Sequence, residues 1–329
     1  MEVEGDSVPN YKMNKTGIVP KFLNRIKKNN LISRDDKLLL AVSGGSDSTA
    51  MAHLAKNLKN KTGIAYIDHK LRKESDSEKK FVRALAKKLK MPFYTRNSAV
   101  AGFAEKNKKS VEDAAREIRY RLLADICGKS GFSKILTAHT RSDLLETVLI
   151  KILRGGGLAS FYGIKTKTKI FGAVVLRPML DFDRNELKSF LRKNKIRFIT
   201  DTSNKNQKFL RNKIRYTLIP FLSKNFGGQF EKRLLALSNQ AEDLMEYISA
   251  ARRESGIKNS GKLDIVKYLS YNKFIRKCFL AEFLEREVNS GYIGEIDRFI
   301  RRKKGGSFTL RGFDFIIKKG VGTKRKRKK

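Results

Sequence analysis

The chain has 329 residues, 40% of them hydrophobic, which is enough to bury the cores of two domains and excludes a wholly disordered chain. Its 73 Lys and Arg against 33 Asp and Glu give a formal net charge of +40, spread over the whole length. This excess favours a polyanionic partner, and nucleic acid more than an anionic membrane surface, because each neutralised phosphate releases condensed counterions.

The sequence carries no sign of a membrane segment or a metal-binding cysteine motif. No apolar stretch approaches the roughly 20 residues that a spanning helix needs, and the polar first 16 residues lack the apolar core of a signal peptide. We therefore expect a cytoplasmic protein with no membrane partner. Cys127 and Cys278 stand far apart, so neither a disulfide framework nor a zinc site is indicated, and both are expected to be buried thiols. Three histidines in all also exclude a His-rich metal site.

The first half of the chain alternates between strand and helix patterns. Residues 1–17 are predicted to be a flexible arm, and a short basic helix follows at 21–29. The run KLLLAVS at 37–43 is continuously apolar and ends in glycines, which is typical of a strand buried on both faces of a parallel sheet. The pattern predicts a doubly wound, mostly parallel α/β domain over residues 18–181. Further strands are predicted at 63–68, 92–95, 134–138 and 173–177, and helices at 48–58, 75–90, 110–129 and 142–153.

The second half is predicted to form a smaller, mainly helical domain over residues 182–320. Its last segment, 307–318, alternates apolar and polar residues and is expected to be a hairpin. The six consecutive cations at 324–329 lie in a basic tail, 321–329, for which a disordered, solvated segment is the expectation and a dedicated RNA-binding arm the alternative. Helices are predicted at 184–194, 210–222, 230–253, 272–287 and 292–301.

The first loop of the α/β domain is the first indication of chemistry. Its residues are Ser43, Gly44, Gly45, Ser46, Asp47 and Ser48. Glycines between a strand and a helix let backbone amides approach a phosphate, with the helix N-terminus facing the anion. The Gly-Lys-Ser/Thr of a Walker loop is missing, and Asp47 is instead placed to hold Mg²⁺ on a pyrophosphate group. The alternative is a glycine-rich turn with serine caps.

The sequence SGGSDS after a first buried strand resembles the N-type ATP-pyrophosphatases, which split ATP into AMP and pyrophosphate by adenylating a substrate oxygen. Five further segments narrow the resemblance to the tRNA(Ile)-lysidine synthases. The match is specific from Ser43 to Pro220 and looser beyond, and longer members have an extra C-terminal domain that this chain is too short to hold in full. The five segments are carried by His69 and Arg72; by Glu112, Arg116, Arg119 and Tyr120; by His139, Asp143 and Glu146; by Arg177, Pro178 and Arg184; and by Asp201 to Asn204 with Arg211 and Arg215.

The resemblance implies roles for most of these residues. Asp47 and Asp143 are expected to hold Mg²⁺, and Asp143 could instead serve only the dipole of its helix. Glu146 or Glu112 is expected to bind the lysine amine or to take its proton. The expected catalytic residues are Asp47, Arg116, His139, Asp143, Glu146 and Arg215, and the expected substrate-binding residues are His69, Arg72, Glu112, Arg119, Tyr120 and Arg211.

Two structural expectations and two departures accompany these roles. On the helix at 110–129, Glu112, Arg116, Arg119 and Tyr120 are expected to share a polar face, and Val111, Ala115, Ile118 and Leu122 an apolar face that packs on the sheet. Many family members have adjacent acids and a Gln where this chain has Ser142-Asp143-Leu144, so metal coordination depends on Asp47 and Asp143. Members also often have His where Tyr216 stands.

The implied reaction joins free L-lysine to a tRNA base. ATP is the cosubstrate, the wobble cytidine O2 of tRNA(Ile) with a CAU anticodon attacks the α phosphate, and the lysine ε-amine then displaces AMP at C2. A tRNA thiolase of the same fold would need paired cysteines, which Cys127 and Cys278 do not provide. A noncatalytic RNA-binding protein would have no need of Asp47. A homodimer is left open by the sequence.

Overall fold

A computed structural model of the chain describes residues 17–68, 75–98, 100–108, 110–154, 161–200, 210–254, 262–284, 290–302, 305–310 and 313–326. The chain divides into two compact units. The first comprises Met1–Leu144 and Ile164–Gln207, and the second Leu145–Gly163 and Lys208–Lys329. The predicted domain boundary after residue 181 therefore falls inside the first unit. In the part of the chain that the structure describes, no helix is long and apolar enough to cross a membrane.

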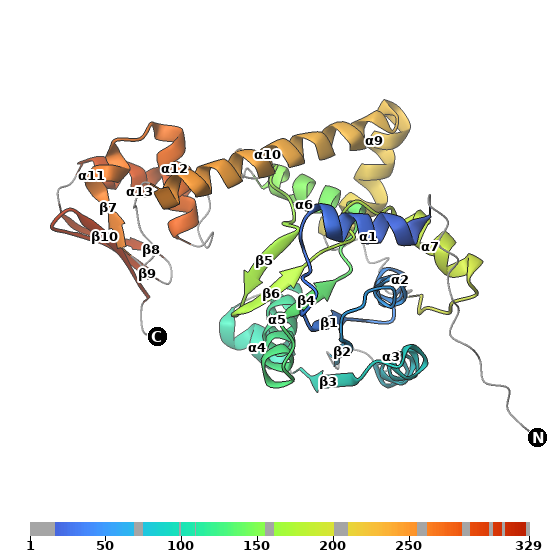
Figure 1. Ribbon diagram of the computed structural model, residues 1–329. Helices are drawn as coiled ribbons and strands as arrows, with labels where there is room; N and C mark the ends of the chain where they lie inside the picture. Colours follow the sequence, from blue (N-terminus) through green and yellow to red (C-terminus); the bar gives the residue numbers. More distant parts are fainter. Residues whose placement is uncertain are drawn as a thin grey trace, which may run out of the picture. The chain divides into compact units, whose positions relative to one another are not determined.

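The first unit is built on a six-stranded sheet with the order β3-β2-β1-β4-β6-β5 (Figure 1). Neighbouring strands run parallel, except that β5 pairs antiparallel with β6. The predicted doubly wound, mostly parallel sheet is confirmed. The strands are β1 Leu38–Ala41, β2 Thr62–Asp68, β3 Phe93–Asn97, β4 Lys134–Thr137, β5 Lys167–Ile170 and β6 Ala173–Leu176.

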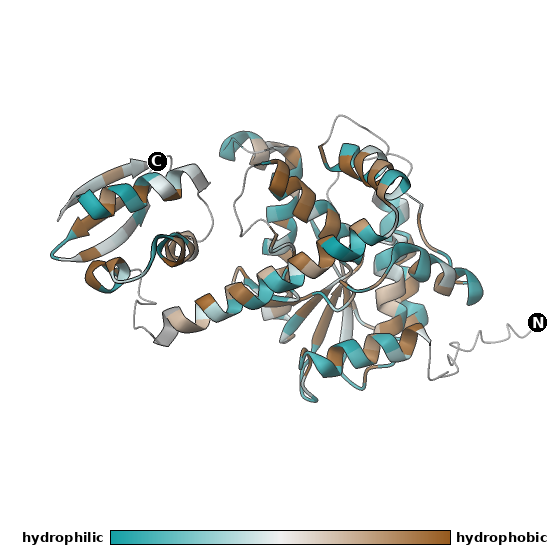
Figure 2. Ribbon diagram, turned by 90° about the horizontal axis from the view of Figure 1, so that it is seen from above, coloured by the Kyte–Doolittle hydropathy of each residue, from teal (hydrophilic) through white to brown (hydrophobic). Residues whose placement is uncertain are grey.

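Helices cover both faces of this sheet. Successive side chains of a strand point to opposite faces, and the leucines of β1 are apolar on both, so both faces have to be buried. Leu38 and Leu40 pack in one buried cluster with α1, α2, α3 and α7, whereas Leu39 packs in another with α5. Figure 2 shows brown strands at the centre and helices that mix brown and teal around them. The helices are α1 Ile18–Lys28, α2 Ser46–Ala55, α3 Ser75–Leu89, α4 Val100–Asn107, α5 Val111–Lys129, α6 Arg141–Leu153, which runs across the division between the units, and α7 Arg184–Lys193.

The strand order places a topological switch point beside β1. The chain runs from β1 to β2 and β3 on one side, and returns to place β4 on the other side of β1. In doubly wound sheets, ligands bind beyond the carboxyl ends of the strands at such a point. The loop after β1 and the residues after β4 therefore meet at the expected ligand-binding edge.

Two elements of the first unit, β5 and α4, were not predicted from the sequence. The hairpin β5–β6 turns at Phe171 and Gly172, whose φ angles of 48° and 83° are those of a two-residue hairpin turn. Strand β5 reads Lys-Thr-Lys-Ile and was not predicted because it is a polar edge strand without an apolar run. Helix α4 covers a second side of α5, where Val100 and Ala104 pack on Ala114 and Ile118.

The second unit combines helices with a small antiparallel sheet of order β7-β10-β9-β8. Its core gathers Ile248, Tyr268, Phe279 and Phe315, each at most 1% exposed. The elements are α8 Leu210–Lys213, the π-helix η3 Ile214–Leu218, α9 Ile219–Phe226, α10 Gln229–Glu254, β7 Lys262–Asp264, α11 Ile265–Leu269, α12 Lys273–Phe283, α13 Ser290–Arg302, β8 Gly306–Leu310, β9 Phe313–Lys318 and β10 Val321–Lys326.

The disorder expected for the cations at 324–329 is wrong for residues 324–326, which belong to β10. This strand pairs with β9 from Val321↔Lys318 to Lys326↔Phe313. Strand pairing uses backbone groups, so a run of cations does not prevent it when the partner strand is present. Residues 327–329 and residues 1–16 of the predicted arm lie outside the described residues.

The predicted helix at 210–222 is interrupted by the π-helical turn η3. Pro220 stands in the first turn of α9, directly after it. A proline ring clashes with the carbonyl four residues earlier, here that of Tyr216, and a widened turn relieves this clash. The segment remains helical without following one regular α-helix.

Candidate functional site

The loop between β1 and α2 adopts a conformation that requires glycine at its first glycine position. Gly44 has φ = 89°, and a Cβ atom there would lie 2.6 Å from Cδ1 of Ile199. The Ile199 amide donates to the Gly44 carbonyl at 2.9 Å, and Gly45 and Ile199 form an isolated parallel bridge. The segment at Ile199 thus supports the loop from outside.

Hydroxyl groups of α2 fix the loop from its other side. The Ser48 Oγ donates to the Gly45 carbonyl at 3.1 Å and accepts from the Ser43 amide at 3.2 Å. The Thr49 Oγ1 donates to the Gly44 carbonyl at 3.0 Å. With its carbonyls bound in this way, the loop is held rigidly at the N-terminus of α2, where an anionic ligand is favoured.

The structure brings Asp47 and Asp143 together through one guanidinium group, that of Arg184. Arg184 Nε lies 2.9 Å from Asp47 Oδ2, and Arg184 Nη2 lies 2.9 Å from Asp143 Oδ1. The three side chains are only 24%, 19% and 11% exposed, in the order Arg184, Asp47, Asp143. The two predicted metal ligands therefore share a partly buried cation, for which the motif resemblance implied no role.

The second oxygen of each carboxylate has a local donor. The Ser46 hydroxyl donates to Asp47 Oδ1 at 3.2 Å. Asp143 Oδ2 accepts from the Thr140 amide at 2.9 Å and from its hydroxyl at 3.0 Å. Asp143 thus stabilises the first turn of α6 and also binds Arg184.

A second ion pair links the same two helix starts. Arg141 Nη2 lies 2.9 Å from Asp183 Oδ2, and the Arg141 amide donates to the Phe182 carbonyl at 3.1 Å. Asp183 also caps α7 in a capping box with Glu186. The N-termini of α6 and α7 are thus joined by two ion pairs, Arg141–Asp183 and Asp143–Arg184. The first pair helps to hold the start of α7, where Arg184 stands.

The donor set suits Mg²⁺ better than a soft metal. Among the described residues, no group of three or more His, Cys, Asp or Glu could hold a metal ion. Mg²⁺ is commonly bound by one or two carboxylates, with substrate phosphates and water completing its octahedron. Asp47 and Asp143 fit that pattern, and Arg184 now occupies one oxygen of each.

A cationic cluster surrounds Tyr120 on α5. The guanidinium carbons of Arg116 and Arg119 each lie 5.4 Å from the centre of the Tyr120 ring. Burial by itself raises the pKa of Tyr120, but the charges of Arg119, Arg177 and Arg116 outweigh it and leave the pKa below its ordinary value. Arg177 is 3% exposed, and its Nη1 donates to the Lys165 carbonyl at 2.7 Å.

His139 stands at the carboxyl end of β4, as predicted. Its Nδ1 lies 3.0 Å from the Thr137 hydroxyl. Burial lowers the pKa of His139 well below its ordinary value, and the nearby arginines act in the same direction against the charge of Asp143. The imidazole is therefore neutral at pH 7, a form that can accept or donate a hydrogen bond but adds no charge.

The predicted division of α5 into two faces is wrong for Tyr120 and Val111, and Ala115 and Ile118 pack against α4 and not on the sheet. Tyr120 is 3% exposed and packs in the cluster between α5 and the sheet, whereas Val111 is 53% exposed. Because α5 is covered by the sheet on one side and by α4 on another, its buried residues extend over more than the single apolar face that was predicted. Glu112 and Arg116 remain on the exposed side.

In the second unit, Glu146 joins Arg211 and Arg215. Glu146 is fully buried; its Oε1 lies 2.6 Å from Arg215 Nε, and its Oε2 lies 2.8 Å from both Arg215 Nη2 and Arg211 Nε. The two arginines, one helical turn apart, thus converge on a single carboxylate. Both oxygens of Glu146 are engaged, which favours a positioning role over proton transfer.

The predicted substrate-binding residues His69 and Arg72 lie outside the described residues, as does the segment at 201–204. Thr140 was not predicted as a site residue, and Arg184 was named only as part of a motif, without a role. The signal for Arg184 was the N-cap Asp183 before it and Glu186 after it, which predict a helix start. The sequence holds no signal for its partners, because they lie 137 and 41 positions away.

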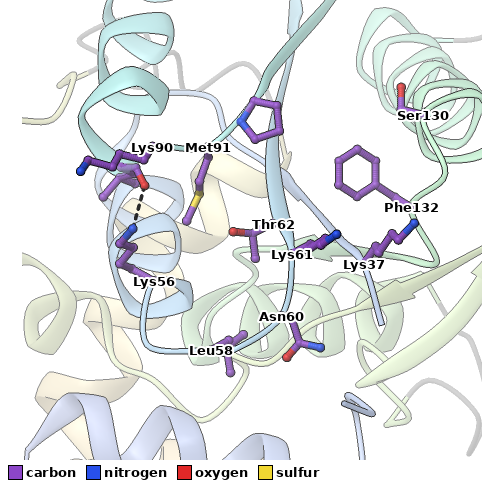
Figure 3. A pocket seen from close by; sticks show the side chains of 12 residues that line it. Lys37, Lys56, Leu58, Asn60, Lys61, Thr62, Lys90, Met91, Ser130 and Phe132 are labelled. Atoms are coloured by element: carbon purple, nitrogen blue, oxygen red, sulfur yellow. Dashed lines mark hydrogen bonds between the residues drawn. The ribbon is translucent and has the colours of Figure 1, made fainter. Parts of the chain in front are cut away.

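A hollow of about 530 Å³ opens at the opposite edge of the first unit's sheet (Figure 3). Lys37, Lys56, Lys61 and Lys90 line it together with Phe132. Helices α2 and α3 end at this hollow. Lys56, the C-cap residue of α2, donates through Nζ to the carbonyl of Leu89, the last residue of α3, at 3.1 Å. Cations near helix C-termini stabilise the helix dipoles. The lysines of this hollow are therefore explained without assuming that a ligand binds there.

Comparisons with known proteins identify the family of the chain. The family described as "PP-loop domain" matches residues 17–222. The tRNA(Ile)-lysidine synthase of Thermosipho africanus is 37% identical over 235 residues, which are 70% of this chain and 54% of that protein, so the match spans about half of that relative. The tRNA(Ile)-lysidine synthase of Petrotoga mobilis is 32% identical over 303 residues, which cover 91% of this chain and 95% of that protein.

Solved structures show the same fold at low identity. A U34-tRNA thiolase of Methanococcus maripaludis superimposes with a TM-score of 0.55 over 69% of this chain and 80% of its own, at 14% identity. That likeness extends to the fold alone. The PP-loop match over more than half of the chain, and relatives above 30% identity along nearly its whole length, confirm the predicted resemblance: the chain belongs to the tRNA(Ile)-lysidine synthase family of PP-loop proteins.

Proposed function

We propose that this protein is a tRNA(Ile)-lysidine synthase, which uses ATP to join L-lysine to the wobble cytidine of tRNA(Ile) with a CAU anticodon. The observation that carries the proposal is the SGGSDS loop at the switch point of the sheet, in a chain that aligns along nearly its whole length with relatives of that name. The net charge of +40 suits a polyanionic substrate.

ATP binds with its phosphates over the loop Ser43 to Ser48. The backbone amides beside Gly44 and Gly45 and the N-terminus of α2 face the phosphates. Asp47 and Asp143 would hold Mg²⁺, which would screen the negative charge of the leaving pyrophosphate. Rigid donors at this place stabilise charge as it develops, without reorganising during the reaction.

Two displacements then give the product. The cytidine O2 attacks the α phosphate, the bond to pyrophosphate breaks, and an adenylated base forms. The uncharged ε-amine of free lysine attacks C2, the C2–O bond breaks, and AMP leaves with the former O2, while the amine loses a proton. The result is lysidine.

Other residues take the roles that their surroundings support. Arg116, on the exposed side of α5, and Arg215 offset phosphate charge, and Arg119 and Arg211 contact substrate. Tyr120, expected from the resemblance to bind substrate, is buried against the sheet and supports Arg116 and Arg119 instead. Neutral His139 offers a hydrogen bond at the strand end. Since both Glu146 oxygens are bound to arginines, exposed Glu112 is the better candidate for the lysine amine. His69 and Arg72 keep their proposed substrate contacts, and the region after residue 182 docks the tRNA.

The chain's cysteines argue against a thiolase of the same fold. Cys127 is buried, donates its thiol to the Phe132 carbonyl at 3.3 Å, and has its pKa raised by burial. A thiol in that state is a poor nucleophile. The chain has one other cysteine, Cys278, and it lies in the other unit.

The test measures AMP and pyrophosphate release as a function of ATP, lysine and unmodified tRNA(Ile). Asp47→Ala is expected to lower turnover at least a hundredfold, a loss of about 2.7 kcal/mol of transition-state stabilisation, with tRNA affinity nearly unchanged. Asp125→Ala, a surface carboxylate on α5 paired with Lys129, is the matched control and should leave turnover intact. Full activity of Asp47→Ala would overturn the role of this carboxylate.

A further inference from the structure

Arg184 sits where the proposed metal ion has to bind. Its guanidinium contacts Asp47 Oδ2 and Asp143 Oδ1, each at 2.9 Å, in a partly buried position. The remaining oxygens are held locally by Ser46 and Thr140. A divalent cation shared by the two aspartates competes for the oxygens that Arg184 now binds.

We infer that Arg184 is an internal counter-ion that makes metal binding at Asp47 and Asp143 depend on the nucleotide. This inference rests on the proposed function, whose metal site it concerns. Two carboxylates that share one guanidinium repel each other when it is removed. Arg184 keeps them together while no nucleotide is bound, and its charge lowers the attraction of the pair for a free cation.

The charge of Arg184 cannot be lost by deprotonation. Guanidinium stays protonated in proteins, so the group leaves the aspartates only by moving to another anion. The phosphates of ATP supply that anion, since they lie over the loop that contains Asp47, and guanidinium binds phosphate with two parallel hydrogen bonds. ATP thereby brings the cation and at the same time gives Arg184 a new partner.

The anchorage of α7 supports such an exchange. The start of α7 is held independently by the Arg141–Asp183 pair, by the capping box of Asp183 and by the Lys21–Glu186 pair. These contacts keep the Arg184 backbone in place while its side chain changes partner. Arg184 is therefore a positioning residue for the metal site.

The experiment titrates the full chain with Mn²⁺ as a probe for Mg²⁺ and follows free Mn²⁺ by electron paramagnetic resonance. Wild type is expected to bind Mn²⁺ weakly alone and at least tenfold more tightly with α,β-methylene ATP. Arg184→Gln is expected to bind Mn²⁺ alone at least tenfold more tightly than wild type and to gain less from the nucleotide. Arg184→Lys, which keeps the charge but not the two-pronged geometry, should fall between them.

Arg121→Gln is the matched control, because it also removes an arginine from an ion pair, the one with Glu117 on α5, and leaves α7, Asp47 and Asp143 untouched. It should bind Mn²⁺ as wild type does. Mn²⁺ binding by Arg184→Gln and Arg184→Lys no tighter than by wild type would overturn the inference. Should Arg184→Gln not fold, Arg184→Lys alone decides.

The failure of this inference is distinguishable from that of the proposed function. Unchanged Mn²⁺ affinity in the Arg184 variants, with nucleotide-dependent binding that Asp47→Ala abolishes, removes the counter-ion role and keeps the metal site. A wild type whose Mn²⁺ affinity is the same with and without the nucleotide overturns the inference. Lysidine formation, measured separately on wild type, decides the proposed function.

Discussion

Glu146 shows what a buried ion pair contributes to this protein. Its carboxylate is fully buried and binds two arginines that are 26% and 21% exposed. Removing one partner of a buried ion pair leaves the others uncompensated, which costs more than the pair itself contributes. The partial exposure of Arg211 and Arg215 reduces that cost.

Glu146→Gln is therefore expected to lower the free energy of unfolding by about 2 kcal/mol, below the 3–5 kcal/mol typical of fully buried pairs. Glu117→Gln, which breaks the more exposed pair with Arg121 on α5, should cost no more than about 0.5 kcal/mol. Urea unfolding followed by circular dichroism measures both. Equal costs for the two variants would contradict the special role of Glu146.

His53 gives the protein a predictable loss of stability in acid. It is 1% exposed on α2, and burial together with the charge of Lys88 lowers its pKa from 6.5 to about 4. Between these two values the unfolded chain binds a proton that the folded chain does not. The stability due to neutral His53 is therefore complete above pH 6.5 and is lost as the pH falls toward 4.

His53→Leu should remove this term, which approaches about 3 kcal/mol at pH 4 since one pKa unit corresponds to about 1.4 kcal/mol. The measurement is urea unfolding of wild type and variant from pH 4 to 8. The difference between them is expected to be constant above pH 7 and to shift in favour of the variant below pH 6.5. A difference independent of pH would contradict the assignment.

At the scale of elements, the loop between β1 and α2 depends on the conformation of one glycine. Alanine at Gly44 meets both a positive φ and Cδ1 of Ile199 at 2.6 Å, whereas alanine at Gly45 has only the Ser43 hydroxyl nearby, at 3.7 Å. Left-handed backbone and local strain cost about 1–3 kcal/mol. Alanine substitutions at the two neighbouring glycines therefore compare a strained position, Gly44, with an unstrained one, Gly45.

Gly44→Ala is expected to lower the free energy of unfolding by about 2 kcal/mol, and Gly45→Ala, at the N-cap of α2, by less than about 1 kcal/mol. Chemical denaturation of the two variants side by side checks this. The strain argument fails if Gly45→Ala proves the more destabilising of the two.

The elements that the sequence predicted are those with a buried periodic pattern. β1, with three consecutive buried leucines, and α7, with its Asp183 cap, follow from local sequence alone. β5 and β10 do not, because their pairing is decided by distant partners and their residues are polar or charged. Tertiary pairing overrode local propensity there.

The candidate site was predictable to the same extent. The loop and the carboxylates Asp47 and Asp143 follow from motif spacing, since both stand where parallel strands end. The Arg184 bridge between them, and the engagement of Glu146 by two arginines, depend on how separate segments pack. No periodicity in the sequence encodes those contacts.

At the scale of the whole molecule, the charge of +40 has a measurable consequence. If the substrate is a tRNA, log Kd should rise linearly with log salt concentration, because phosphates exchange counterions for Lys and Arg. We expect affinity for tRNA to fall at least about a hundredfold between about 50 and 200 mM salt. Asp47→Ala should show the same slope, and a binding constant independent of salt would contradict an electrostatic interface.

We propose above that the loop, its carboxylates and the basic surface together make lysidine. The most direct measurement incubates the protein with ATP, isotopically labelled L-lysine and unmodified tRNA(Ile), then digests the tRNA and determines the masses of its nucleosides. The expected product is a cytidine derivative that carries the labelled lysine and requires ATP for its formation. Lysine-dependent release of AMP without that labelled nucleoside would contradict this proposal.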